Sequence, residues 1–73
     1  MNNRDKEIFF KGTILAAERK IKEAAKEGKT EIDFYGDYEY ADPKEIGTIF
    51  ETQGFKYHIE GAMIGWKIIF NWE

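Results

Sequence analysis

The sequence contains no cysteine and no serine, and it has a single histidine and a single proline. Without cysteine the chain has no disulfide framework, no thiol nucleophile and no cysteine-ligated zinc site. Without serine a Ser–His–Asp hydrolase is excluded, and the lone His58 lacks the nucleophile and paired acid that general-base chemistry needs. The spacing of the carboxylates does not match a calcium loop either. We therefore expect a protein that is not an enzyme and that holds no cofactor and no metal.

Long apolar runs are also lacking, because no stretch approaches the roughly 18 apolar residues of a membrane span. After Met1, residues 2–7 are polar, and no apolar segment of signal-peptide length follows them. This pattern predicts a soluble protein that works in the cytoplasm and does not engage a membrane.

Aromatic residues are abundant, with 12 Phe, Trp and Tyr among 73 residues. A chain of this size buries only about 60% of its unfolded surface, so these rings must supply much of the core. Hydrophobic residues make up 42% of the sequence, and no linker, repeat or low-complexity segment divides it. The composition predicts one small domain over residues 1–73.

In the first half of the chain, the spacing of apolar residues changes once, from that of a helix to that of a strand. Over residues 5–27 apolar residues recur at helical spacing, which predicts an amphipathic helix that Gly28 ends. From residue 30 the period is two, which predicts a strand over residues 30–35. Gly36 is expected to be a bulge or the end of this strand.

The second half begins with a helix-start signal, in which Asp42 is the N-cap and Pro43 occupies the first turn. Gly54 is the expected stop of this second helix. Apolar residues then alternate over residues 55–60 and again over 66–72, and the glycine-containing segment between them predicts a hairpin.

The predicted order is therefore α-β-α-β-β, an α+β fold. A helix connects the first two strands, so these strands should run parallel, with the third strand antiparallel to the second. We expect a three-stranded mixed sheet with both helices packed on one face. The sequence leaves open whether the third strand is central or at an edge.

Charge is distributed unevenly along the chain. Residues 1–30 contain eight basic and five acidic side chains, whereas residues 31–51 contain seven acidic side chains and only Lys44 as a base. The net charge of the whole chain is −3, so nearly all the excess negative charge comes from this middle segment.

Alternate residues of a strand lie about 6.6 Å apart on one face, so acids at every second position can form a row with a spacing comparable to that of a nucleic-acid backbone. This predicts binding to a basic, DNA-binding partner, with tyrosines as packing contacts. An ordinary solvated surface explains the same pattern without a partner. The predicted contact residues are Glu31, Asp33, Tyr35, Asp37, Tyr38, Glu39, Asp42, Glu45 and Glu51.

Two further surfaces are candidates for contacts. Lys56, His58 and Lys67 on the predicted hairpin would lie beside exposed aromatic rings that can stack on bases, which is the pattern of a nucleic-acid-binding or regulatory module. The acidic total charge disfavours that function. In the first helix, Ile8 and Leu15 are seven residues apart and lie off the core stripe, so they are a candidate homodimer contact.

The segments EIDFYGDYEY at residues 31–40, GFKY at 54–57 and GWKIIFNW at 65–72 resemble small early host-takeover proteins of virulent Bacillus phages. Among these, the chain looks most like the type that inhibits the nucleoid protein HU by imitating DNA. The resemblance implies a non-enzymatic protein in the host cytoplasm that occupies the basic arms and saddle of the HU dimer. Such a protein binds no nucleic acid directly.

Overall fold

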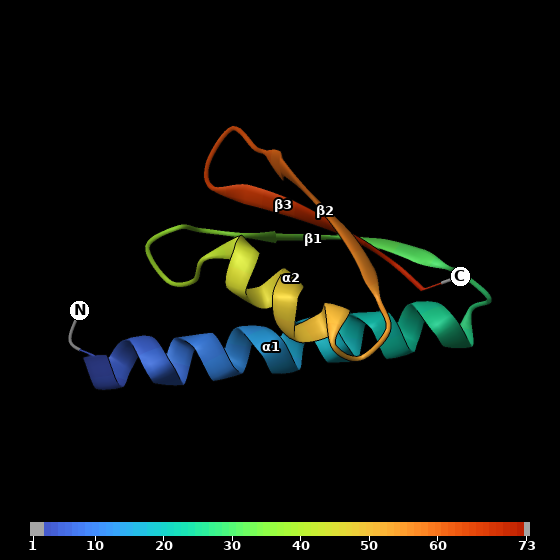
Figure 1. Ribbon diagram of the computed structural model, residues 1–73, viewed down its shortest axis with the longest axis horizontal. Coiled ribbons are helices and arrows are strands. Elements are labelled where there is room, and N and C mark those ends of the chain that lie inside the picture. Colours follow the sequence, from blue (N-terminus) through green and yellow to red (C-terminus); the bar gives the residue numbers. More distant parts are fainter. Residues whose placement is uncertain (1–2, 73) are drawn as a thin grey trace.

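The computed structural model describes residues 3–72 and contains two helices and three strands (Figure 1). The α+β class and the predicted element order are confirmed. The elements, in chain order, are α1 (Asn3–Lys26), β1 (Glu31–Gly36), α2 (Pro43–Glu51), β2 (Lys56–Gly61) and β3 (Trp66–Asn71).

The sheet has the order β1-β3-β2, and both of its pairings are antiparallel. The predicted mixed sheet was therefore wrong. β1 and β2 run in the same direction, as expected, but β3 lies between them and they do not pair with each other. β3 alternates buried and half-buried residues along its whole length. Its apolar side chains gain most from the central position, where a strand has neighbours on both edges.

Both helices pack on one face of the sheet, as predicted, and the core fills the space between these layers (Figure 1). The core is rich in aromatic side chains, and Phe50 and Phe70 lie at its centre with ring centroids 4.8 Å apart. Helix α1 contributes small and branched residues, while its N-terminal half extends beyond the sheet (Figure 1). The buried core residues are Ala17, Ile21, Ala24, Ile32, Phe34, Ala41, Ile46, Phe50, Trp66, Ile68 and Phe70.

The predicted signals at helix ends are confirmed. The carboxylate of Asp42 accepts a 2.9 Å hydrogen bond from the backbone N–H of Lys44, which is an N-cap contact. After α2, Gly54 has φ of +97°, and the N–H of Phe55 donates to the carbonyl oxygen of Phe50 at 3.1 Å. This is the 6→1 bond of a Schellman motif, which needs a residue in the left-handed conformation.

Two loops meet at the end of the molecule where α1 begins: the β1–α2 loop and the β2–β3 loop (Figure 1). Trp66 starts β3 between Gly36 and Gly61, and its buried Nε1 donates a 3.0 Å hydrogen bond to the carbonyl oxygen of Ala41. Gly65 precedes it with φ of +86° and lies directly against the backbone of Gly36. These contacts fix the position of the β1–α2 loop, which carries Asp37, Glu39 and Asp42, three of the seven predicted acidic residues.

Candidate protein-binding surface

The predicted row of acids is divided in two by the point at which β1 ends. The strand stops at Gly36, and the chain then turns, with the N–H of Tyr40 donating to the carbonyl oxygen of Asp37 at 3.1 Å. The carboxylate of Asp37 stabilises this turn because it accepts a 2.9 Å hydrogen bond from the N–H of Glu39. Glu31 and Asp33 therefore lie on the sheet, while Asp37, Glu39 and Asp42 lie on the loop.

The acids of β1 lie on the open face of the sheet, opposite the helices, where they meet basic residues. The pairing register places Glu31, Asn71 and Lys56 in one row across the sheet, and Asp33, Ile69 and His58 in the next. The third row is Tyr35, Lys67 and Glu60. This face thus carries both signs of charge rather than a continuous negative row.

Glu60 contacts two side chains of this face, Lys67 and His58. Its carboxylate lies 3.1 Å from Nζ of Lys67 and 3.6 Å from Nε2 of His58. The hydrogen bond from Lys67 and the negative charge of Glu60 raise the pKa of Lys67 above its ordinary value of 10.5. Burial lowers this pKa slightly, and the charge of Asp33 raises it further.

Replacing Glu60 by glutamine is expected to move the pKa of Lys67 down, toward 10.5. Because the pKa of Lys67 is higher in the folded state, the pair stabilises the fold below pH 10.5, and this stabilisation is lost as the pH rises through the folded-state pKa. An NMR titration of the Lys67 side chain in wild type and Glu60→Gln measures the shift directly. An unchanged pKa in the variant would show that another group holds the proton.

The nucleic-acid alternative depended on exposed aromatic rings beside the hairpin bases. In the structure the aromatic side chains of β2 and β3 face the helices: Tyr57 packs against the core, and Trp66 and Phe70 are buried. The only aromatic side chain of the three strands on the open face is Tyr35 of β1. The stacking platform that this alternative needs is therefore absent from the open face of the described residues.

Four carboxylates remain on the β1–α2 loop and the first turn of α2. We call Asp37, Glu39, Asp42 and Glu45 the acidic loop. Within residues 3–72, none of the four forms an ion pair with a lysine, an arginine or the histidine. Glu51 is exposed but lies at the other end of α2, so the fold separates it from the acidic loop.

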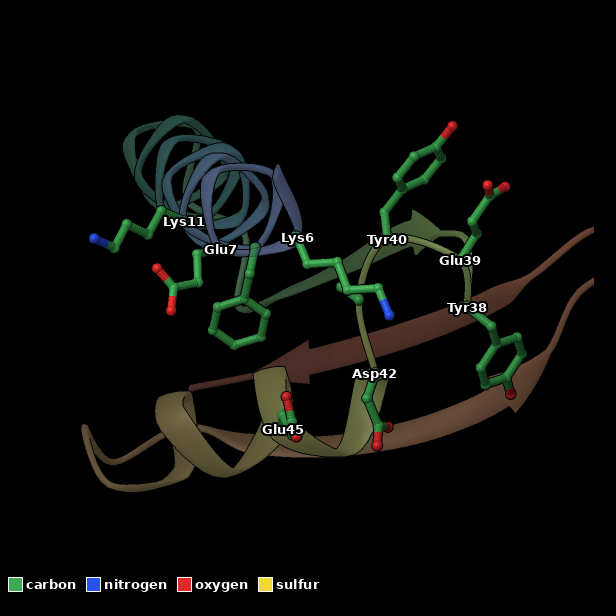
Figure 2. Close-up of a pocket in the computed structure, with 10 residues that line it drawn as sticks. Lys6, Glu7, Lys11, Tyr38, Glu39, Tyr40, Asp42 and Glu45 are labelled. Atoms are coloured by element: carbon green, nitrogen blue, oxygen red, sulfur yellow. The ribbon is translucent and has the colours of Figure 1, made fainter. Parts of the chain in front are cut away.

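An open hollow of about 630 Å³ separates the acidic loop from the first turns of α1 (Figure 2). The side chain of Lys6 extends from α1 into this hollow, toward Asp42 (Figure 2). Glu39 and Tyr40 point to one side of the loop, whereas Tyr38 and Asp42 point to the other (Figure 2). The loop is thus a ridge with a carboxylate on each side.

Residues of α1 at this hollow were not among the predicted contacts. Lys6, Glu7 and Lys11 line it together with the loop, and Phe9 contacts Tyr40 with ring centroids 5.0 Å apart. In the sequence these residues look like a solvated helix face with alternating charges. These residues lie near the loop because α1 packs beside it. The sequence around them does not indicate where α1 packs.

Residues 3–72 contain no group of three or more histidine and carboxylate side chains that could hold a metal ion. None of the described helices is long and apolar enough to cross a membrane.

One side-chain contact from α1 also reaches the backbone of β1. Nζ of Lys20 in α1 donates a hydrogen bond to the backbone carbonyl oxygen of Asp33. The positive charge of this lysine lies beside the acids of β1, which adds to the mixed charge of the open face.

A scan against protein-family models and searches of curated proteins and of solved structures returned no match to this chain.

Proposed function

We propose that the protein is a non-enzymatic inhibitor that binds a basic bacterial DNA-binding protein of the HU type through the acidic loop, in place of DNA. The observation that carries this proposal is the cluster of four carboxylates within nine residues, none of which is paired with a base among residues 3–72. Unpaired carboxylates on one short segment repel each other, so a basic partner relieves an unfavourable interaction.

The shape of the loop supports this kind of partner. HU-type proteins hold DNA mainly through its phosphates and its deformability, so a competitor needs negative charge but no base edges. A ridge with Glu39 on one side and Asp42 on the other presents charge to both walls of a basic cleft (Figure 2). Asp37 and Asp42 accept backbone hydrogen bonds, which hold the ridge in one conformation before binding.

Exposed tyrosines add apolar contact area to the acidic loop. The side chain of Tyr38 is 62% exposed, and Tyr40 is 39% exposed although it contacts Phe9. Tyrosine is enriched in protein interfaces because it combines a large ring with a polar hydroxyl. The proposed contact surface therefore consists of the acidic loop and these two rings.

Neutralising Glu39 and Glu45 is expected to weaken inhibition by about tenfold or more, because both carboxylates supply negative charge, whereas the hydrogen bonds that hold the loop and cap α2 are accepted by Asp37 and Asp42. The measurement is the fluorescence anisotropy of labelled duplex DNA held by HU, titrated with wild type or Glu39→Gln/Glu45→Gln at two salt concentrations. Salt should weaken the wild-type effect, because the association is electrostatic.

The matched control is Glu18→Gln/Glu23→Gln, which removes the same charge from α1, away from the acidic loop. The control should inhibit as wild type does. Equal loss in both variants would mean that net charge, and not the acidic loop, drives competition. Absence of DNA displacement by folded wild-type protein would refute the proposed function.

A further inference from the structure

The β2–β3 loop exposes two large apolar side chains. Met63 is fully exposed and Ile64 is 80% exposed, so the fold buries almost none of either side chain. We call these two residues the apolar tip. Single exposed apolar residues are common on protein surfaces, but two adjacent ones in a loop that carries no charge between residues 61 and 65 have the character of a contact site.

The backbone of the loop is held in place on both sides of the apolar tip. The N–H of Ala62 donates a 3.4 Å hydrogen bond to the carbonyl oxygen of Gly65, which closes the hairpin around Met63 and Ile64. Gly65 has φ of +86° and lies against the backbone of Gly36. Because these contacts exist before any partner binds, less backbone entropy is lost when the tip is buried in a complex.

The apolar tip lies beside the acidic loop. Both loops are at the end of the molecule where α1 begins (Figure 1). A side-chain carbon on Gly65 would lie 3.1 Å from the Cα atom of Asp37, the first residue of the acidic loop. Tyr38, which follows Asp37, is also exposed. The two loops therefore place apolar and negatively charged groups next to each other on one surface.

The negative charge beside the tip decides which kind of surface it can enter. Membrane surfaces with anionic lipids attract basic segments and would repel the four carboxylates of the acidic loop. A two-fold contact between the tips of two copies would bring their acidic loops together, which is also unfavourable. A basic protein attracts the acidic loop and can offer an apolar depression to the tip as well.

We infer that Met63 and Ile64 anchor the complex with the basic DNA-binding partner by entering an apolar depression at the border of its positively charged surface. This inference rests on the proposed function and adds an apolar subsite to the acidic loop. The two parts contribute differently: attraction by the acidic loop speeds association and is screened by salt, whereas burial of the tip slows dissociation and involves no charge to screen.

The exposed apolar side chains of α1 are a separate feature. Ile8 and Leu15, the predicted homodimer contact, are 60% and 61% exposed. Whether they bind a second copy stays a prediction. Leu15 lies four residues beyond Lys11, the last residue of α1 that lines the hollow beside the acidic loop. It is therefore an exposed apolar side chain away from the proposed contact surface, and it serves as a matched control.

Isothermal titration calorimetry with purified HU, at several salt concentrations and two temperatures, tests the anchor. We expect Met63→Gln/Ile64→Gln to raise the dissociation constant by about tenfold or more at every salt concentration. The dependence on salt should stay that of wild type, because no charge is removed, whereas Glu39→Gln/Glu45→Gln should depend less on salt. The heat-capacity change of binding should become less negative, because less apolar surface is buried.

The controls use the exposure of these side chains. Circular dichroism of Met63→Gln/Ile64→Gln should match that of wild type, since neither side chain packs in the core. The matched pair is Ile64→Gln and Leu15→Gln, which replace one exposed aliphatic side chain each. Ile64→Gln should weaken binding, and Leu15→Gln should bind HU as wild type does.

Three results would overturn the inference even if wild type binds HU. The double variant could bind with wild-type affinity, it could lose affinity with the altered salt dependence of Glu39→Gln/Glu45→Gln, or wild type could bind phosphatidylglycerol vesicles that the double variant does not bind. The last result would assign the tip to a membrane. If folded wild-type protein does not bind HU at all, the proposed function fails and this inference fails with it.

Discussion

Replacing Trp66 by alanine is expected to unfold most of the protein at room temperature. Trp66 is fully buried, packs near Phe34 with ring centroids 6.0 Å apart, and donates a buried hydrogen bond to the carbonyl oxygen of Ala41. Truncating such a side chain costs about 3–5 kcal/mol. A domain of this length has a total stability of about 4–11 kcal/mol, with small domains near the lower end. Urea unfolding followed by circular dichroism measures the loss.

Two variants calibrate this result. Trp66→Phe keeps a ring in the core but leaves the carbonyl of Ala41 without its donor, so a smaller loss of about 1–3 kcal/mol is expected. Trp72→Ala should cost less than Trp66→Ala, because Trp72 is only half-buried and lies just beyond the end of β3. A Trp66→Ala protein with the urea midpoint of wild type would contradict the position of Trp66 in the core.

Gly65→Ala is expected to destabilise the protein by more than about 2 kcal/mol. Gly65 has φ of +86°, which is unfavourable for alanine, and the new side-chain carbon would overlap the backbone carbonyl of Gly36. A backbone group held in a strand cannot move aside as the end of a flexible side chain can. The β2–β3 loop would have to separate from β1, which also disturbs the neighbouring Trp66.

Two other glycines separate the causes of this effect. Gly54 also has a positive φ of +97° but has open space around it, so Gly54→Ala should cost about 1 kcal/mol for conformation alone. Gly61 has neither restriction, so Gly61→Ala should change stability by only about 0.5 kcal/mol. Urea unfolding of the three variants gives the series. Equal losses for Gly65→Ala and Gly54→Ala would mean that the two loops do not touch.

The parts of the fold that were predicted correctly depend on local interactions. The N-cap at Asp42 and the stop at Gly54 involve residues at most five positions apart, so a short stretch of sequence contains all the participants. The same is true of the alternation along β1, where a one-residue shift would expose Ile32 and Phe34. The number, type and order of the elements follow from such signals.

The strand order could not be predicted because it depends on contacts between distant residues. A helix between β1 and β2 makes them run in the same direction, and this was predicted correctly. Whether they also pair depends on where β3 inserts, which is decided by burial of residues 66–71 against both neighbours. No local pattern near β1 or β2 contains that information.

The candidate site was predicted in composition but not in arrangement. The alternation of acids predicted a single row from Glu31 to Glu39. In the structure the strand ends at Gly36, and the carboxylate of Asp37 stabilises a turn after it. The bases opposite Glu31 and Asp33 come from β2 and β3, so only the pairing register shows them. Whether the acidic loop binds a basic protein stays a prediction.

The hydrogen bond from Lys20 to the carbonyl oxygen of Asp33 has a consequence for behaviour at high concentration. A sheet of three strands has two outer edges, and an uncovered edge is a template on which further strands add until fibrils form. Along β1, an added strand would have to displace the ammonium group of Lys20 and accept a positive charge beside its backbone. A lysine from the helical layer thus occupies one backbone acceptor of the β1 edge and disfavours the addition of a strand at that point.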